Sequence, residues 1–298
     1  MGWAGSPARP GRLVAAGFPA PEPRLSTRPG GSRPRRATMS AMATVGERLA
    51  RIVAFQEGIA RRSAQRLVPI PGGFAVLDDR YPASYEHNQL FVTAPVAAAS
   101  VVAEADRLLR RRRHRYVTAL DGDVARRLTP GLLAAGYREE GTVVMVLTAA
   151  PHRLEATSVV VERVPLEDLR DADARAWDER YPDLPADIVT QLFERRTVTA
   201  AACDLSTHVV RADGGIVAWC NLYRAGREAQ VESVNTLPRW RRRGFATAVV
   251  LDAVSAARDA GCELVFLLAD RDDWPRDFYE RLGFVVIAEQ RSFVRVLA

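Results

Sequence analysis

The sequence predicts a mixed α/β fold made of two similar lobes, each a sheet flanked by helices. Three observations support this class. The chain has 298 residues, of which 48% are hydrophobic, and this is enough for two domains with substantial cores. Strand-like and helix-like segments alternate from Thr44 onward. The order of segments in the first half is repeated in the second, as expected of a duplicated unit.

The first half opens with a helix. Apolar residues between Leu49 and Ile59 follow a helical stripe, so we expect a helix that ends near Leu67, before Pro69. The further elements expected here are strands at Phe74 to Leu77 and Gln89 to Thr93, a helix at Val96 to Arg113, a strand at Tyr116 to Leu120, a helix at Asp123 to Ala135 and a strand at Thr142 to Leu147.

The second half repeats this order and ends in the same way. The elements expected are strands at 159–164 and 207–211 around helices at 166–181 and 188–196, a hairpin of 216–223 and 229–236 joined through 224–226, a helix at 244–259, a strand at 263–269, a helix at 275–282 and a strand at 284–296. We place the boundary near Ala149-Ala150-Pro151, which gives an N-terminal domain at 44–150 and a C-terminal domain at 151–298.

Residues 1–43 form a tail that we expect to be disordered. The tail is rich in Pro, Gly, Arg and Ser and lacks a sustained apolar period. It holds seven arginines and one acid, which accounts for the whole net charge of +6, so residues 44–298 are neutral overall. Met39 and Met42 leave two interpretations open, an upstream extension or a targeting segment. We expect no nucleic-acid partner for the folded part.

Composition excludes several classes of protein. Three cysteines without a C-x-x-C pair do not make a disulfide framework, and they favour a reducing, cytoplasmic location. The apolar runs are shorter than the roughly 18 residues of a membrane span, so no membrane partner is expected. The four histidines are isolated, and we therefore expect no metal site.

The segment from Val231 to Thr247 carries the most specific signal. A strand-like run leads into a turn that holds three arginines and Gly244, and this turn opens directly into an apolar helix. The first N–H groups of a helix have no partner within it, and the helix dipole places roughly half a positive charge there. Because glycine also permits close approach to the backbone, the segment predicts a site for a diphosphate.

At these residues the chain resembles a known family. Arg241-Arg242-Arg243-Gly244-Phe245-Ala246 resembles the pattern (Gln/Arg)-x-x-Gly-x-(Gly/Ala) of the GNAT superfamily of acyl-CoA N-acyltransferases. Asp277 to Phe284, with the sequence D-F-Y-E-R-L-G-F, is similar to a signature near the C-terminus of that family. The resemblance implies that each lobe contains a mixed, mostly antiparallel sheet and that acetyl-CoA is the co-substrate.

The resemblance also implies where the coenzyme lies. It is expected in a gap between the strand that ends near Thr236 and the strand that ends near Ala269, where free backbone groups pair with its pantetheine amides. The cofactor-binding residues implied are Val234, Asn235, Thr236, Arg241, Arg242, Arg243, Gly244, Phe245, Ala246 and Thr247.

Two residues are implied in the chemistry. Tyr279 is expected to protonate the leaving thiolate, the alternative being that its ring only packs beside Phe278. Glu232 is the candidate base for the amine, the alternative being a strand carboxylate paired with an arginine. Relatives often carry an asparagine after the second strand, whereas this chain has Asp270 and Asp272, for which we favour capping of the next helix.

The two halves differ where the coenzyme loop is expected. The first half has Ala94 to Ala98 there, with neither arginine nor glycine, so we expect a degenerate copy that does not bind coenzyme. We therefore interpret the chain as a tandem N-acetyltransferase that transfers directly to an amine, as a monomer or homodimer. The alternative is a non-catalytic acyl-CoA sensor. The acceptor, a small molecule or a peptide, stays open, and we expect residues 166–196 and the cleft between lobes to select it.

Overall fold

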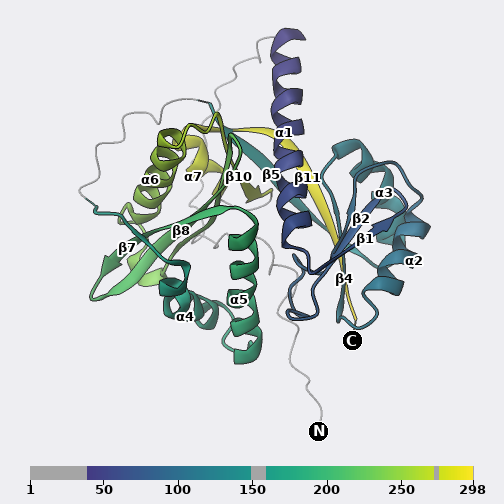
Figure 1. Cartoon of the computed structure of the whole chain (residues 1–298), viewed down its shortest axis with the longest axis horizontal. Helices are drawn as coiled ribbons and strands as arrows, with labels where there is room; N and C mark the ends of the chain where they lie inside the picture. Colours follow the sequence, from purple (N-terminus) through teal and green to yellow (C-terminus); the bar gives the residue numbers. More distant parts are fainter. Residues whose placement is uncertain (1–38, 149–158, 272–274, 298) are drawn as a thin grey trace, which may run out of the picture.

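The chain forms one continuous sheet with helices packed against it (Figure 1). The computed structural model describes residues 39–148, 159–271 and 275–297. Eleven strands follow the order β1-β2-β3-β4-β11-β5-β10-β9-β8-β7-β6. Among the described strands only β3 with β4 and β9 with β10 pair in parallel, and the other neighbours are antiparallel. The predicted fold class, a mixed and mostly antiparallel sheet flanked by helices, is confirmed.

The N-terminal half, residues 39–148, contains three helices and five strands. Their bounds are α1 (Met39–Ser63), β1 (Arg66–Ile70), β2 (Gly73–Leu77), β3 (Gln89–Val92), α2 (Ala98–Leu108), β4 (His114–Ala119), α3 (Gly122–Ala134) and β5 (Arg138–Leu147). The start of α1 falls inside the predicted tail, and the rest of that tail lies outside the described residues.

One element of this half was predicted wrongly. The helix was expected to reach Leu67, but α1 ends at Ser63 and Leu67 belongs to β1. Proline is normally excluded from a strand because it cannot donate to the ladder. Here β1 is the edge strand, with β2 as its neighbour, so Pro69 is tolerated opposite Phe74.

The C-terminal half, residues 159–297, follows the predicted order closely. Its elements are β6 (Glu162–Val164), α4 (Arg170–Arg180), α5 (Ala186–Ala202), β7 (Asp204–Ala212), β8 (Gly215–Ala225), β9 (Glu228–Thr236), α6 (Phe245–Asp259), β10 (Leu264–Asp270), α7 (Pro275–Arg281) and β11 (Phe284–Val296). Short 3-10 turns precede α4 and α6. The predicted hairpin of β8 and β9 is present.

The last strand of each half pairs with the other half. Strand β11 lies between β4 and β5, and β5 lies between β11 and β10 (Figure 1). At the centre of the sheet, β5 and β11 pair over their length, from Phe284 opposite Leu147 to Val294 opposite Arg138. The two halves are therefore joined by exchanged strands. The predicted boundary at 149–151 lies outside the described residues.

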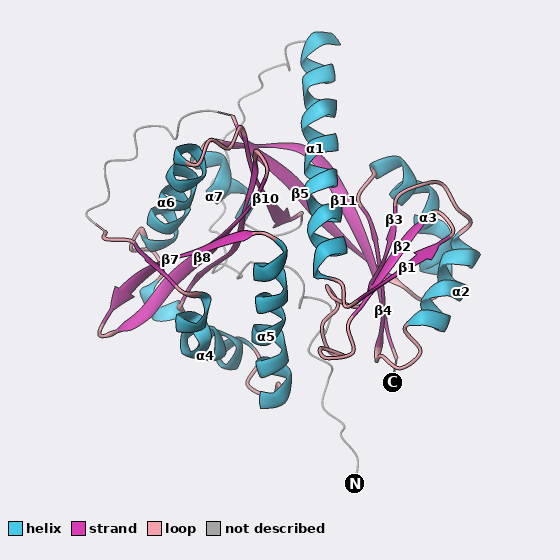
Figure 2. Cartoon of the chain, viewed as in Figure 1, coloured by secondary structure: helices cyan, strands magenta, loops and turns pink. Residues whose placement is uncertain are grey.

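Helices cover the sheet in two groups and at its centre (Figure 2). In the N-terminal half, α2 and α3 bury their apolar faces on one hydrophobic cluster, and α6 and α7 contribute to a larger one in the C-terminal half. Helix α1 packs over the centre, where Phe55 meets the fully buried Phe266 edge-on with ring centroids 5.2 Å apart. Within the described residues, no helix combines the length and apolar character that a membrane crossing requires.

Candidate active site

The site begins where β9 separates from β10. Their parallel ladder runs from Glu228 opposite Leu264 to Val231 opposite Leu267 and goes no further in the described strands. Beyond Val231 the pairing of β9 with β8 shifts by one residue, and Ser233 adopts a positive φ of 54°. An extra residue of this kind bends a strand and disrupts its ladder. The bulge therefore opens the sheet at the place predicted for the coenzyme.

A cavity of about 240 Å³ lies at this opening. Its walls from the C-terminal half include Glu232 and Val234 of β9, Asp270 of β10 and Tyr279 of α7. The structure thus brings together the two predicted catalytic residues and one predicted coenzyme residue. Asp270 ends β10 and lines the cavity, while Asp272 lies outside the described residues.

Glu232 is held in the wall by short polar contacts. Its Oε2 accepts a hydrogen bond of 2.7 Å from Nε2 of Gln230, and its Oε1 accepts one of 3.1 Å from the N–H of Ser233. Burial raises the pKa of Glu232, and the negative charge of Glu86 raises it further. A carboxylate with a raised pKa is a stronger base than an exposed one when it is ionised.

Tyr279 is buried between aromatic side chains but still lines the cavity. Its ring centroid lies 5.0 Å from that of Phe278 and 6.1 Å from that of Phe284. Burial raises the pKa of Tyr279, and the charge of Glu232 raises it as well. The phenol therefore keeps its proton at neutral pH, and packing fixes its ring. The packing alternative and the catalytic role are compatible in this arrangement.

The turn before α6 places Gly244 directly ahead of the helix, where the sequence predicted it. Gly244 is the N-cap residue, has a positive φ of 79° and provides no side-chain cap for the first turn. A Cβ added at Gly244 would meet no atom within 4 Å, so the space beside this backbone is open. Ala248 N–H donates to the Gly244 carbonyl, while Phe245, Ala246 and Thr247 form the first turn. The N–H groups of these three residues belong to the first turn, where a helix offers them no acceptor of its own.

The arginines of this turn are arranged differently from one another. Arg241 donates from Nε to the carbonyl oxygen of Thr236 at 3.1 Å and so ties the turn to the end of β9. Arg242 and Arg243 are exposed, and the Arg243 guanidinium lies 4.7 Å from the ring centroid of the buried Trp240. Two cationic side chains thus remain at the surface beside Gly244.

Asn235 and Thr236 lie deeper than predicted for coenzyme contacts. Both are buried, and neither belongs to the cavity wall. Within the described residues, Asn235 Oδ1 and Thr236 Oγ1 have no hydrogen-bond partner. Both residues lie at the end of β9, beside the turn that leads to α6.

The N-terminal loop at 94–98, which the sequence predicted to correspond to the coenzyme loop, packs against protein. The loop before α2 folds onto the turn between β1 and β2, where Thr93 and Ala94 donate to the carbonyl of Gly72. A Cβ at Gly72 would lie 2.9 Å from Cβ of Val96. The loop at 94–98 therefore packs tightly against protein, in contrast to the open space beside Gly244.

Sequence reasoning missed a second wall of the cavity, which comes from the opposite side of the opening. We call it the polar wall, and it consists of Glu86, Gln89, Tyr116, Thr118 and Ser292. Thr118 Oγ1 donates to Gln89 Oε1 at 2.6 Å and lies 3.1 Å from Ser292 Oγ. Polar residues in a strand also face solvent in many proteins, so the sequence did not distinguish these from surface residues.

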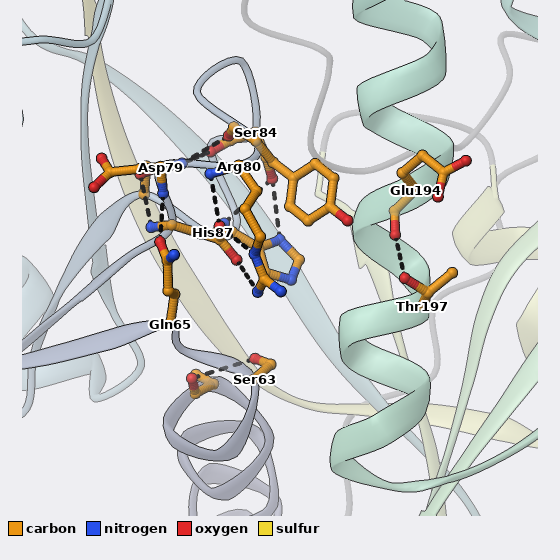
Figure 3. A network of polar contacts seen from close by, with 12 residues as sticks. Ser63, Gln65, Asp79, Arg80, Ser84, His87, Glu194 and Thr197 are labelled. Atoms are coloured by element: carbon orange, nitrogen blue, oxygen red, sulfur yellow. Dashed lines mark hydrogen bonds and ion pairs between the residues drawn. The ribbon is translucent and has the colours of Figure 1, made fainter.

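The loop at 81–88, which carries Glu86 of the polar wall, is held by internal hydrogen bonds. Within this loop Ser84 Oγ lies 3.1 Å from His87 Nδ1, and Asn88 Nδ2 donates to the carbonyl oxygens of Tyr81 and Ser84. Figure 3 shows the network beside α5. Arg195 of α5 donates from Nη1 to Glu86 Oε2 at 2.6 Å and joins the loop to the C-terminal half.

The other charged groups of the cavity are also paired or buried. Arg196 donates from Nη2 to Asp173 Oδ1 at 2.8 Å, and its Nη1 has no hydrogen-bond partner among the described residues. Burial by itself would raise the pKa of Glu86, but the positive charge of Arg195, together with His87, has the larger effect, and the pKa is lowered.

In the described part of the chain, no cluster of three or more His, Cys, Asp or Glu residues is arranged to hold a metal ion.

Comparison with known proteins agrees with this geometry. Residues 166–284, which carry both sequence motifs, match the acetyltransferase (GNAT) family. No curated protein sequence is significantly similar to the chain. The match supports the GNAT superfamily, whose members use acyl-CoA, and it supports acyl transfer as the general chemistry.

Three solved structures share the fold. A functionally unknown conserved protein from Staphylococcus epidermidis is 13% identical, with a TM-score of 0.61 over 79% of this chain and 95% of that one. A GCN5-related N-acetyltransferase from Kribbella flavida is 19% identical, with a TM-score of 0.53 over 83% of this chain and 94% of that one. One from Sphaerobacter thermophilus is 19% identical, with a TM-score of 0.51 over 76% of each chain. Each match covers at least 76% of this chain, which is more than either half contains. The common fold therefore includes parts of both halves.

Proposed function

We propose that the protein is an N-acetyltransferase that transfers an acetyl group from acetyl-CoA directly to a primary amine. The observation that carries this proposal is the cavity at the separation of β9 and β10, whose walls include Glu232, Val234 and Tyr279. The match of residues 166–284 to a family of acyltransferases supports the class of reaction.

The site fits a coenzyme with an anionic and an amide-rich part. Gly244 leaves open space at the N-terminus of α6, where the helix dipole and the exposed Arg242 and Arg243 favour a diphosphate. At the bulge, β9 turns its backbone away from β10, and amide groups of pantetheine would pair there around Val234. We propose that Asn235 and Thr236 support the end of β9 beside the turn.

The reaction needs a base and an acid. The amine nitrogen attacks the thioester carbon, a C–N bond forms, the C–S bond breaks, and the amine loses one proton while the sulfur gains one. Glu232 would accept the proton from the amine, directly or through water, because its raised pKa makes it a competent base. Tyr279 would donate its proton toward the leaving sulfur and recover one from solvent.

We propose further that the N-terminal half is a degenerate copy of the C-terminal one. Strands β1 to β3 and strands β7 to β9 each form an antiparallel run, and each run is followed by a helix, a strand that pairs in parallel, a second helix and a last strand. The C-terminal half has β6, α4 and α5 in addition. The loop before α2 packs against the turn between β1 and β2, where Val96 lies beside Gly72, and this supports loss of a coenzyme site in the first copy. The three cysteines are free thiols, which supports a cytoplasmic enzyme.

Release of free thiol from acetyl-CoA in the presence of a panel of amines tests the function, with calorimetry as the binding assay. We expect both binding and amine-dependent release. Binding without release on any amine would favour the alternative, a non-catalytic acyl-CoA sensor. The absence of any heat with acetyl-CoA would remove the assignment altogether.

A further inference from the structure

We propose that Glu86 binds a second cationic group of the acceptor, so that the enzyme acts on small diamines. The inference rests on the proposed function and extends it to the class of acceptor. It also gives the N-terminal half a role, since Glu86 comes from the half that we interpret as having lost its coenzyme site.

The charges of the cavity favour a cation. Three carboxylates line it, and they belong to Glu86, Glu232 and Asp270. The guanidiniums that line it, those of Arg195 and Arg196, are both engaged in ion pairs, at 2.6 Å and 2.8 Å respectively. The partner of Arg196 is the buried Asp173, which neutralises this guanidinium from outside the cavity wall. The carboxylates therefore outnumber the guanidiniums, and a ligand with positive charge is attracted.

Glu86 is placed to make such a contact. Its side chain lines the cavity and is 47% exposed, so a ligand can reach it. Arg195 contacts Oε2, which leaves Oε1 available for a second donor. The lowered pKa of Glu86 keeps the group ionised at neutral pH. An ionised carboxylate that already has one partner can accept another ammonium hydrogen bond.

The loop that carries Glu86 is rigid before any ligand arrives. Asn88 fixes two carbonyl groups of the loop, and Arg112 donates from Nε to Asn88 Oδ1 at 2.9 Å. Arg80 makes two hydrogen bonds with the buried carboxylate of Asp78. A preorganised carboxylate costs little conformational entropy when it binds.

Two carboxylates at one cavity favour an acceptor with two positive centres. The negative charge of Glu86 acts on Glu232 and disfavours ionisation of both groups together. A diamine would place one ammonium on Glu86 and its reacting amine near Glu232.

The size of the cavity limits the size of the acceptor. The cavity volume of about 240 Å³ is below that of sites for drug-sized ligands, which begin at roughly 300 Å³. The acceptor is therefore small.

Calorimetry with matched ligands tests this inference on the full-length protein saturated with coenzyme A. The ligands are 1,4-diaminobutane, butylamine, which lacks the second cation, and 4-aminobutanoate, which replaces that cation with a carboxylate. We expect the diamine to bind at least tenfold more tightly than either of the others. Equal or weaker binding of the diamine would overturn the proposal, and this comparison needs no variant.

Glu86→Gln identifies the residue responsible. We expect the Kd of the diamine to rise at least tenfold, to the value for butylamine, while the Kd of coenzyme A stays unchanged. The matched control is Glu228→Gln, because Glu228 also joins the halves, through Arg51 at 2.7 Å, but does not line the cavity. An unchanged diamine Kd in Glu86→Gln, or an equal loss in Glu228→Gln, would contradict the inference. If coenzyme A itself fails to bind, the proposed function fails instead.

Discussion

The carboxylate of Glu86 and the guanidinium of Arg195 lie 2.6 Å apart, on opposite halves of the molecule. Glu86 precedes β3 in the N-terminal half, and Arg195 belongs to α5 in the C-terminal half. Both line the cavity that also contains Glu232 and Tyr279. The walls of the candidate active site are thus shared between the halves.

Gly244→Glu tests the coenzyme site. The new carboxylate would stand at the positive end of α6, beside the predicted diphosphate, and would occupy the space through which a ligand reaches the backbone. We expect the Kd of acetyl-CoA to rise at least tenfold, about 1.4 kcal/mol. Calorimetric titration of acetyl-CoA measures this change.

Gly261→Glu is the matched control for this variant. Gly261 follows the other end of α6, has a positive φ of 76° and has no atom within 4 Å of an added Cβ. Both substitutions therefore place a side chain on a left-handed backbone and lower the stability by the same amount, roughly 1–2 kcal/mol. Only Gly244→Glu should weaken acetyl-CoA binding, and an equal Kd in the two variants would remove the turn before α6 from the coenzyme site.

Tyr279→Phe tests the acid. The change removes a hydroxyl from the cavity wall and keeps the ring that packs beside Phe278. We expect kcat to fall roughly a hundredfold or more, the usual contribution of a general acid, with little change in the Kd of acetyl-CoA. Tyr137→Phe is the control, because the buried Tyr137 hydroxyl has no partner among the described residues and lies outside the cavity wall. Undiminished turnover in Tyr279→Phe would exclude the tyrosine from the mechanism.

Local patterns predicted those parts of the site that depend on neighbouring residues in sequence. The turn at Gly244 and the strand that carries Glu232 were placed correctly, because an N-cap glycine and an alternating strand depend on short-range geometry. The polar wall was not predicted. Glu86 and Ser292 are more than 200 positions apart, and the pairing of β11 with β4 and β5 brings β11 beside the N-terminal strands.

Exchange of the last strands could not be read from the sequence for the same reason. The segment of β5 has the same strand pattern whether it pairs with β4 or with β10, since both neighbours are mostly buried strands. The edge position of β1 explains the other error. Pro69 argues against a central strand, but it says nothing against an edge strand.

If Glu232 is the base, kcat/KM should fall at acid pH, which gives the pH profile an acid limb. A base must be ionised to accept a proton, so kcat/KM should rise as pH rises through the pKa of Glu232, which lies above its ordinary value of 4.5. Glu86→Gln removes a negative neighbour, which lowers this pKa and shifts the limb to lower pH. Glu232→Gln should abolish the limb. A profile that is unaltered in Glu232→Gln would assign the limb to another group.

His114 predicts a loss of stability at acid pH. Burial lowers its pKa from 6.5 to about 4, and its Nε2 lies 3.0 Å from the carbonyl of Asn88. Between these pH values the unfolded chain binds a proton that the folded chain does not, so the free energy of unfolding falls as pH drops from 6.5 toward 4. The loss from this group is about 3 kcal/mol. Urea unfolding at several pH values should show a flatter dependence in His114→Gln, and a parallel dependence would contradict the assignment.

The exchanged strands predict that the C-terminal half does not fold alone. In a fragment of residues 151–298, β10 and β11 would lose β5, the strand that separates and pairs with both of them. Their buried apolar residues and ladder groups would then meet solvent or another chain. We expect this fragment, expressed by itself, to show no cooperative thermal unfolding and to aggregate.

Expressing residues 39–150 together with residues 151–298 should restore a soluble complex, because β5 and β11 can then take their places from separate chains. Size-exclusion chromatography and circular dichroism measure both results. If the isolated C-terminal fragment is monomeric and unfolds cooperatively, β5 is dispensable. The strand exchange would then contribute little to the stability of the C-terminal half.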